Sequence, residues 1–229
     1  MGNKKNENKK SENKNGIMEV VFILDRSGSM SGMEADTIGG FNSVLQKQKD
    51  ESDKIVWSTV LFDHDHEVIH NRTPIQKVEP LNDKQYYVRG TTALLDAVGR
   101  AIHHIGMCHK YAKPEDVPEK TLFIITTDGY ENASREYSYR KVRQMIELEQ
   151  GKYGWEFLFL GANIDAPQVA GRMGICESRA ATYINDEVGI RKNFEAFSAS
   201  MAKMARMEDF DSADLDEIRE DFKKRGGRH

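Results

Sequence analysis

The chain has 229 residues, of which 38% are hydrophobic and 31% are charged, so it holds enough apolar material for one core of ordinary size. No apolar run approaches the roughly 18 residues of a membrane-spanning helix, and we therefore expect no integral membrane protein. The net charge is −4. The first sixteen residues carry five Lys against two Glu, which leaves the rest of the chain distinctly acidic and argues against nucleic acid as the main partner.

Polar segments flank a single predicted domain over residues 17–207. Residues 1–16 consist almost entirely of Asn, Lys, Glu, Ser and Gly, which bury too little surface to fold, and they predict a disordered polar tail. Residues 208–229 are rich in charge and predict a frayed helix end and a charged tail. The start of the chain lacks an apolar signal core, and Cys108 and Cys176 fit reduced thiols, so we expect a cytoplasmic protein.

Buried strands are predicted by four apolar runs, at residues 17–24, 55–62, 121–127 and 155–160. Continuous apolar runs, rather than alternating ones, are typical of parallel strands that are covered on both faces. Residues 68–78 follow a polar turn and contain Pro74, which favours a short antiparallel strand at the edge of the sheet.

Helices are predicted by apolar residues spaced three and four apart, within residues 38–45, 94–105, 142–148 and 190–204. The sequence therefore predicts an α/β fold, a single doubly wound, mostly parallel sheet with one antiparallel edge strand and helices on both faces. The Met-rich stretch at residues 201–207 is interpreted as core packing, with a partner surface as the alternative.

Three predicted loops at strand ends or helix starts carry side chains with oxygen atoms. The first holds Asp25, Ser27 and Ser29 around a glycine, which permits a tight turn that aims three oxygens at one point. Thr92 lies on a second loop that opens a helix, and Asp128 lies on a third loop after a strand. Ligands of an open parallel sheet bind where strands end and loops begin, so we expect these five side chains to meet.

Their chemistry indicates a hard divalent cation, because hydroxyl and carboxylate oxygens are the ligands that such ions prefer. We expect Mg²⁺, with Mn²⁺ or Ca²⁺ as alternatives. Ser27, Ser29 and Thr92 would supply neutral oxygens, while Asp25 and Asp128 would supply charge directly or through water. A metal held mainly by neutral hydroxyls stays electrophilic and keeps a position that an Asp or Glu of a partner can take.

The combination resembles the von Willebrand factor A (vWA) domain with its metal-ion-dependent adhesion site, the MIDAS. Asp25, Ser27 and Ser29 match the family pattern Asp-x-Ser-x-Ser, Thr92 matches the Thr of its second loop, and Asp128 matches the Asp of its third. The resemblance covers nearly the whole chain between the tails and implies the Rossmann-like vWA fold. It also implies that the metal bridges the domain and a carboxylate of a partner protein. A switch is implied as well, in which the metal exchanges Thr92 for Asp128 as direct ligand while the last helix moves.

The resemblance extends to intracellular bacterial proteins, which implies an adaptor whose partner belongs to an ATPase-linked or stress-response system, with no nucleic acid and no membrane. Gly129, Glu131, Asn132 and Asn163 follow strand ends and are interpreted as a rim that contacts this partner, with plain turns as the alternative. We therefore expect a binding protein rather than an enzyme.

Two other functions stay open. A magnesium-dependent phosphohydrolase would use Asp25 as its nucleophile, although Ser27 stands where such sites place a second acid. A nucleotide-binding protein is less favoured, because neither a G-x-G-x-x-G nor a P-loop pattern occurs. Simple helix capping by Asp25 and Ser27 would not need five oxygen donors.

Histidines occur in two further clusters. Residues 63–66, Asp-His-Asp-His, predict a polar hairpin turn, with a second metal site as the alternative. His103, His104 and His109 lie near the C-terminus of a predicted helix, where the helix dipole favours cationic groups, and we expect them to be exposed.

Overall fold

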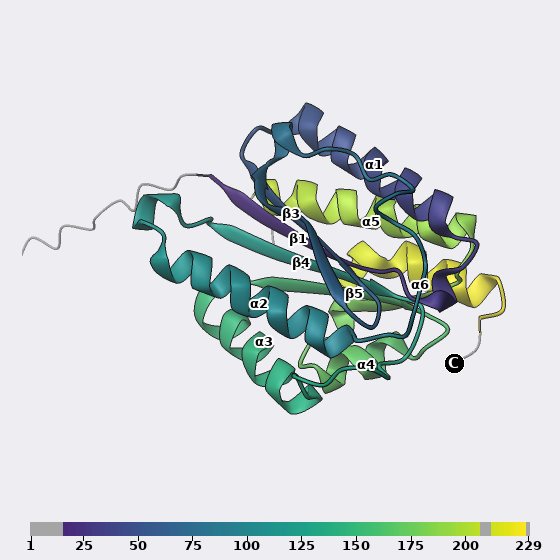
Figure 1. Ribbon diagram of the computed structural model, residues 1–229. Coiled ribbons are helices and arrows are strands. Elements are labelled where there is room, and N and C mark those ends of the chain that lie inside the picture. The colour runs from purple at the N-terminus through teal and green to yellow at the C-terminus, as the bar shows by residue number, and fades with distance from the viewer. Residues whose placement is uncertain (1–15, 207–211, 228–229) are drawn as a thin grey trace, which may run out of the picture.

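A six-stranded sheet lies at the centre of the computed structural model, which describes residues 16–206 and 212–227 (Figure 1). Its strands are β1 (Met18–Asp25), β2 (Ile55–Phe62), β3 (His66–Pro74), β4 (Lys120–Thr127), β5 (Glu156–Ala162) and β6 (Ala180–Tyr183). They lie in the order β3-β2-β1-β4-β5-β6. Neighbouring strands run parallel except β2 and β3, which form an antiparallel hairpin. The predicted mostly parallel sheet with one antiparallel edge strand is confirmed.

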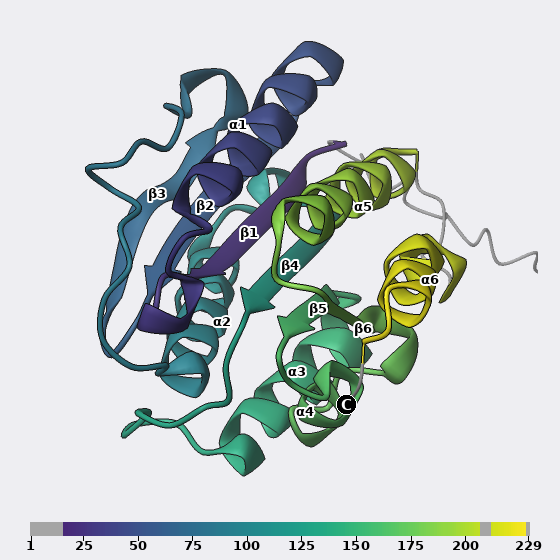
Figure 2. The same cartoon turned by 90° about the vertical axis from the view of Figure 1, so that its right-hand side faces the viewer.

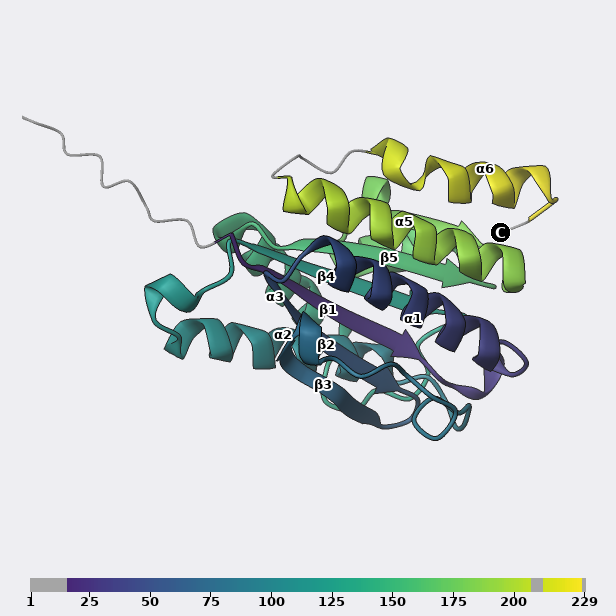
Figure 3. The same ribbon diagram turned by 90° about the horizontal axis from the view of Figure 1, so that it is seen from above.

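Helices cover both faces of this sheet, as predicted. Those of one face are α1 (Glu34–Glu51), α5 (Glu187–Ala205) and α6 (Asp216–Lys224), and those of the other are α2 (Leu94–Tyr111), α3 (Tyr139–Tyr153) and α4 (Ala166–Arg172) (Figures 1 and 3). Successive side chains of a strand point to opposite faces, so β1 contributes to two cores. Phe22 packs in the core under α1 and α5, whereas Val21 and Ile23 pack in the core under α2.

The first core has an aromatic centre. The ring of Phe22 stacks on Trp57 with centroids 4.7 Å apart, and the rings of Phe41 and Phe197 meet it edge-on at 5.5 and 5.8 Å. All four side chains are fully buried. Because helices cover both faces, a strand such as β1 needs apolar side chains at consecutive positions, which explains its continuous run.

Local signals set the helix ends. The Ser138 side chain accepts a hydrogen bond from the N–H of Lys141 at the start of α3, and Asp186 accepts one from the N–H of Gly189, 2.9 Å away, at the start of α5. Gly154 ends α3 in the left-handed conformation with φ of 67°, which a glycine adopts at low cost.

The structure differs from the sequence prediction near the C-terminus. Strand β6 was not predicted, and α6 lies inside the segment 208–229 that was interpreted as a charged tail. Leu215 and Ile218 are buried in the core under α5, and α6 packs beside β6. The segment holds four large apolar residues, Phe210, Leu215, Ile218 and Phe222, among many charged ones. The last three have the spacing of one helix face, a signal that the prediction of a charged tail did not use. Residues 207–211 and 228–229 lie outside the described residues.

His109 is not exposed, so that prediction is wrong. Its side chain is 12% exposed, and Nε2 lies 2.5 Å from Oε2 of Glu19, a carboxylate fully buried in β1. Its ring also packs edge-on against Trp155. The dipole of its own helix does not decide the environment of His109, because a buried carboxylate on another element holds the imidazole. His103 and His104 are exposed as predicted.

Smaller predictions concern particular side chains and the termini. Met201 and Met204 are buried, which confirms core packing for that part of α5, while Met207 lies outside the described residues. The predicted tail over residues 1–16 also lies outside them, apart from Gly16. Cys108 and Cys176 are free thiols. In the described part of the chain, no helix is long and apolar enough to cross a membrane.

Candidate metal centre

The candidate site lies at the edge of the sheet where the parallel strands end. β1 and β4 are neighbours, with Leu24 opposite Thr126, and Figure 2 shows their arrowheads at the same end. β2 lies on one side of β1 and β4 on the other, so the strand order reverses at this point. Loops diverge at such a reversal and leave the crevice in which open α/β sheets bind ligands. Asp25 is the last residue of β1, and Asp128 follows the last residue of β4.

The structure brings the five predicted side chains together. Ser27 Oγ lies 3.0 Å from Ser29 Oγ and 3.2 Å from Thr92 Oγ1. Ser29 Oγ donates a hydrogen bond to Asp128 Oδ1, and Asp25 Oδ1 accepts one of 2.7 Å from the N–H of Ser27. Three loops that are far apart in sequence therefore contribute to one connected group of oxygen atoms, which we call the oxygen cluster.

The two carboxylates of the oxygen cluster are buried without a cationic partner. Asp25 is fully buried and Asp128 is 2% exposed. Burial raises the pKa of Asp25, and burial together with the charge of Asp25 raises the pKa of Asp128 to about 6. In the described part of the chain no lysine, arginine or histidine pairs with either carboxylate. Two carboxylates and three hydroxyls in this arrangement fit a hard divalent cation, which would supply the missing positive charge.

Neighbouring groups fix the position of Asp25. The Thr127 hydroxyl donates to Asp25 Oδ2 at 2.6 Å, and the Tyr86 hydroxyl donates to the Asp25 carbonyl oxygen at 2.5 Å. Burial raises the pKa of Tyr86 far above its usual value, so this phenol stays a hydrogen-bond donor. The sequence analysis missed both residues. Thr127 ends a predicted strand next to Asp128 and could have been found, but nothing in the sequence marks Tyr86.

Asn185 is a further residue that the sequence analysis missed. Its Nδ2 donates to Asp128 Oδ2 at 3.0 Å from the loop between β6 and α5, while its buried Oδ1 has no hydrogen-bond partner. A fourth loop therefore contacts the oxygen cluster. The unpredicted β6 brings this loop to the site, and the only sequence signal is a polar pair, Asn185 and Asp186, ahead of a helical pattern.

Two of the four predicted rim residues use their side chains for hydrogen bonds to the backbone of this chain. Glu131 Oε2 accepts a hydrogen bond of 2.9 Å from the N–H of Leu95, and Asn132 Oδ1 accepts one of 2.9 Å from the N–H of Thr92. These contacts fasten the loop after β4 to the start of α2 and so hold Thr92 in place. Their side chains have a structural role here that turn statistics do not reveal.

Of the other two rim residues, Gly129 lies beside the oxygen cluster and Asn163 lies on the loop after β5. A Cβ added to Gly129 would lie 3.5 Å from both Ser29 Oγ and Thr92 Oγ1, so the glycine keeps the space next to these hydroxyls open. Asn163 is exposed at the end of β5, with φ of 56°. Tyr130, which follows Gly129 and is 50% exposed, was not predicted as part of this surface.

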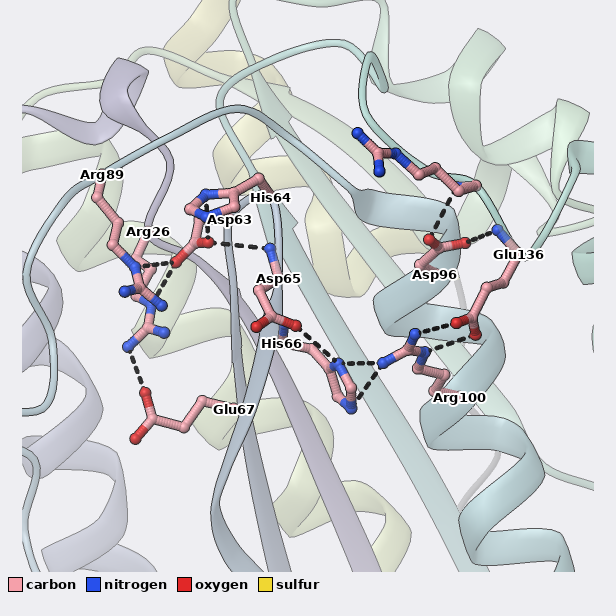
Figure 4. A network of polar contacts seen from close by, with 11 residues as sticks. Arg26, Asp63, His64, Asp65, His66, Glu67, Arg89, Asp96, Arg100 and Glu136 are labelled. Carbon is pink, nitrogen blue, oxygen red and sulfur yellow. Dashed lines mark hydrogen bonds and ion pairs between the residues drawn. The ribbon is translucent and has the colours of Figure 1, made fainter.

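Residues 63–65 connect β2 to β3, which begins at His66, in a polar hairpin turn, as predicted. Figure 4 shows Asp63 paired with Arg26 and Arg89, and His66 paired with Arg100. The side chains of His64 and Asp65 contact Asp63 and His66 within the turn. Within residues 16–206 and 212–227 no three His, Cys, Asp or Glu side chains are grouped as they would be around a shared metal. The alternative of a second metal site at this turn therefore gains no support from the geometry.

The fold and the oxygen cluster together define a vWA domain. The chain belongs to the family described as "VWA domain containing CoxE-like protein", whose model matches residues 7–149. No curated protein matches the chain. The identification from the three loop motifs is thus confirmed at the level of the family.

Solved structures resemble this chain at low identity. The vWF domain of the type V pili tip protein Mfa5 from Porphyromonas gingivalis is 9% identical with a TM-score of 0.58, and the match covers 82% of this chain and 96% of that one. The PilB minor pilin from Streptococcus sanguinis is 13% identical with a TM-score of 0.56, at 82% and 62% coverage. Proximal thread matrix protein 1 from the mussel byssus, whose MIDAS motif is occupied by zinc in that structure, is 16% identical with a TM-score of 0.55, at 81% and 46% coverage.

These likenesses show the fold alone. The chain spans less than two thirds of the minor pilin and less than half of the byssus protein.

Proposed function

We propose that this vWA domain is a metal-dependent protein-binding module. The hydroxyls of Ser27, Ser29 and Thr92 would hold a divalent cation, and Asp25 and Asp128 would balance its charge. The observation that carries the proposal is the oxygen cluster, whose two buried carboxylates have raised pKa values and, among the described residues, pair with no basic side chain. Oxygen ligands favour Mg²⁺, with Mn²⁺ or Ca²⁺ as alternatives. The zinc-occupied MIDAS motif of the byssus protein supports a divalent ion at this place.

The partner would supply an Asp or Glu carboxylate to the open position of the metal. Ser29 is exposed, whereas the other four side chains of the oxygen cluster are at most 3% exposed. A partner would therefore approach from the side of Ser29, and Tyr130 and Asn163 are exposed residues of loops at the same edge of the sheet. We propose that these two residues, with Gly129, form the surface that the partner contacts.

Binding rather than catalysis suits the position of Asp25. A phosphohydrolase nucleophile needs a carboxylate oxygen that can reach the substrate. Asp25 is fully buried, and its two oxygens accept hydrogen bonds from the Ser27 N–H and the Thr127 hydroxyl. We therefore propose no enzymatic role. The acidic chain and its free cysteines support a cytoplasmic location, with a partner protein of an ATPase-linked or stress-response system rather than nucleic acid or a membrane.

Calorimetric titration with MgCl₂ tests the metal site. Wild-type protein should bind one Mg²⁺, and Asp25→Ala should bind none. Asp116→Ala, which removes an exposed aspartate from the turn before β4, is the matched control and should bind as wild type does. Absence of binding by wild type to Mg²⁺, Mn²⁺ and Ca²⁺ alike would end the proposal.

Manganese relaxation tests the open position. Mn²⁺ bound to the wild type should enhance the relaxation of water protons, because water would take the coordination position that is proposed for the partner. Acetate, as a probe for the carboxylate of a partner, should displace that water and reduce the enhancement. Once a partner is identified, it should bind in Mg²⁺ and dissociate in chelator, and equal binding in both would contradict the mechanism.

A further inference from the structure

A buried arginine lies inside the first loop of the oxygen cluster. Arg26, between Asp25 and Ser27, has a fully buried side chain that points toward Asp63 at the end of β2 (Figure 4). Its Nε donates to Asp63 Oδ2 at 2.8 Å, and its Nη1 donates to Glu67 Oε2, also at 2.8 Å. A buried guanidinium is costly unless its charge is paired in good geometry. These contacts therefore hold Arg26, and with it the backbone that presents Ser27.

The same aspartate also holds the second loop. Asp63 Oδ2 accepts a further hydrogen bond from Arg89 Nε at 2.8 Å, and the Asp63 carbonyl oxygen accepts one of 2.7 Å from the N–H of Ala93. Ala93 directly follows Thr92, so this bond fixes the backbone that presents the Thr92 hydroxyl. Asp63 is fully buried. Asp63 thus binds Arg26, which precedes Ser27, and Ala93, which follows Thr92.

The two loops also form backbone hydrogen bonds with each other, next to Asp63. The N–H of Arg89 donates to the Arg26 carbonyl oxygen at 2.9 Å, and the N–H of Gly28 donates to the Gly90 carbonyl oxygen at 3.2 Å. The guanidinium groups of Arg26 and Arg89 share the Asp63 carboxylate and both lie over the ring of Tyr87. Without the carboxylate between them, the two cations would repel and the loops would separate.

We propose that Asp63 is a positioning residue for the metal site: it sets the distance between the hydroxyls of Ser27 and Thr92 by holding the loops of both. The inference rests on the proposed metal-binding function. Asp63 does not contact the five side chains of the oxygen cluster and acts through Arg26, Arg89 and the N–H of Ala93. Partners that orient metal ligands from outside contribute about 10- to 100-fold to metal affinity in other proteins, so Asp63→Asn should raise the Kd for Mg²⁺ by at least about tenfold.

The chain offers a matched control at the other end of β1. Glu19 is also fully buried and is held by two basic side chains, Arg72 Nε at 2.7 Å and His109 Nε2 at 2.5 Å. It precedes Asp25 by six residues, which places it about 20 Å from the oxygen cluster along the strand. Glu19→Gln removes a comparable buried ion pair without touching either loop.

The experiment compares wild type, Asp63→Asn and Glu19→Gln by Mg²⁺ calorimetry, thermal unfolding and amide hydrogen exchange of the metal-free protein. Both variants should unfold at lower temperature than wild type. Only Asp63→Asn should raise the Kd for Mg²⁺, and only Asp63→Asn should speed the exchange of the Gly28 and Ala93 amides. Arg89→Gln, which removes a 40% exposed partner of Asp63, gives the same test if Asp63→Asn does not fold, and its Kd should rise in the same direction.

Two results would overturn the inference. One is a Kd of Asp63→Asn, or of Arg89→Gln in its place, within about twofold of wild type, the range expected for independent sites. The other is an equal rise in Kd for Glu19→Gln. If wild type binds no Mg²⁺, the proposed function fails by itself. Amide hydrogen exchange of the metal-free wild type and Asp63→Asn then tests whether Asp63 positions the loops. Unchanged exchange at Gly28 and Ala93 in Asp63→Asn would overturn its positioning role.

Discussion

Replacing Asp128 with asparagine should stabilise the metal-free protein while abolishing its response to metal. Asp128 is 2% exposed, and its nearest partners are the Ser29 hydroxyl and the Asn185 amide, neither of which carries charge. Burial and the nearby Asp25 raise its pKa to about 6. At neutral pH the folded chain therefore keeps an ionised carboxylate in an unfavourable place, and Asp128→Asn removes that charge.

The size of the effect follows from the raised pKa. A rise from 3.8 to about 6 corresponds to about 3 kcal/mol at about 1.4 kcal/mol per pH unit. Because Ser29 leaves one side of the oxygen cluster open to solvent, we expect screening to reduce this to about 2 kcal/mol. In a chain of this size that is an increase in Tm of about 4–8 °C. The new amide can be satisfied, because Asn185 can flip and accept with the Oδ1 that has no partner now.

The pH dependence gives the same prediction a second test. A carboxyl whose pKa is raised on folding stabilises the native state below about pH 4, and that contribution is lost as the pH rises through about 6. In chelator, wild type should thus lose about 2 kcal/mol more than Asp128→Asn between pH 4 and pH 7. The two proteins should unfold at similar temperatures at pH 4.

Thermal unfolding in chelator and in excess Mg²⁺ is the assay. Metal at 100 times its Kd should stabilise wild type by about 2.7 kcal/mol and should leave Asp128→Asn unchanged. Asp116→Asn, at an exposed position, should behave as wild type in both conditions. A metal-free Asp128→Asn protein that unfolds at lower temperature than wild type at pH 7 would refute the idea that the cluster holds uncompensated charge.

Three further predictions concern the frame around the site. Burial raises the pKa of Asp63, but hydrogen bonds to Arg side chains and a backbone N–H outweigh this and hold it below its usual value of 3.8. In urea unfolding, the stability that Asp63→Asn loses at pH 7 should therefore be present above about pH 4 and should decrease as the pH falls further, through the lowered pKa of Asp63. Ile218→Ala should cost about 2–4 kcal/mol and speed hydrogen exchange in α6 and β6 first, and unchanged exchange would contradict the docking of α6. Gly40→Ala should lower the free energy of unfolding by about 1–3 kcal/mol, and Tm with it, because its Cβ would lie 2.1 Å from Cδ2 of Phe194. Gly39→Ala, whose Cβ would meet nothing within 4 Å, should not lower it.

The parts of the fold that the sequence predicts are those in which each segment carries its own signal. Strands covered on both faces must be apolar throughout, so β1, β2, β4 and β5 are visible as runs. β6 has four residues, and Ile218 is the buried residue of α6, with Leu215 buried just before the helix. Such short elements are stable only against neighbours that the chain supplies elsewhere, and a local pattern cannot show this.

The same distinction applies to the site. Asp25, Ser27 and Ser29 lie within five residues of one another and form a motif, and parallel strands bring Asp128 to the same edge. The residues that hold the motif do not share this property. Arg26 and its partner Asp63 are 37 positions apart, and Asn185 is 57 positions from Asp128. Contacts of this kind appear only when the strand order and register are known.

Three neighbouring strands, β2, β1 and β4, each end in an aspartate at this edge: Asp63, Asp25 and Asp128. Each of the three is an aspartate at the end of an apolar run, and the sequence offers Asp25 and Asp128 as ligands of one metal and Asp63 as part of an alternative second site. The structure separates them by the charges they meet. Asp63 receives two arginine side chains and its pKa falls, whereas the other two meet only neutral donors and their pKa values rise.

The aspartates at this edge of the sheet therefore differ in the role for which they are suited. An aspartate neutralised by arginines has no charge left for a cation and is suited to fix the loops around it. Two aspartates that lack such partners keep a net negative charge in a buried place at neutral pH, which a bound cation would relieve. The arginine in the second position of the Asp-x-Ser-x-Ser motif therefore serves the site by pointing away from it. A cation placed among the oxygens would have competed with the metal, while the same cation on Asp63 holds the ligands in position.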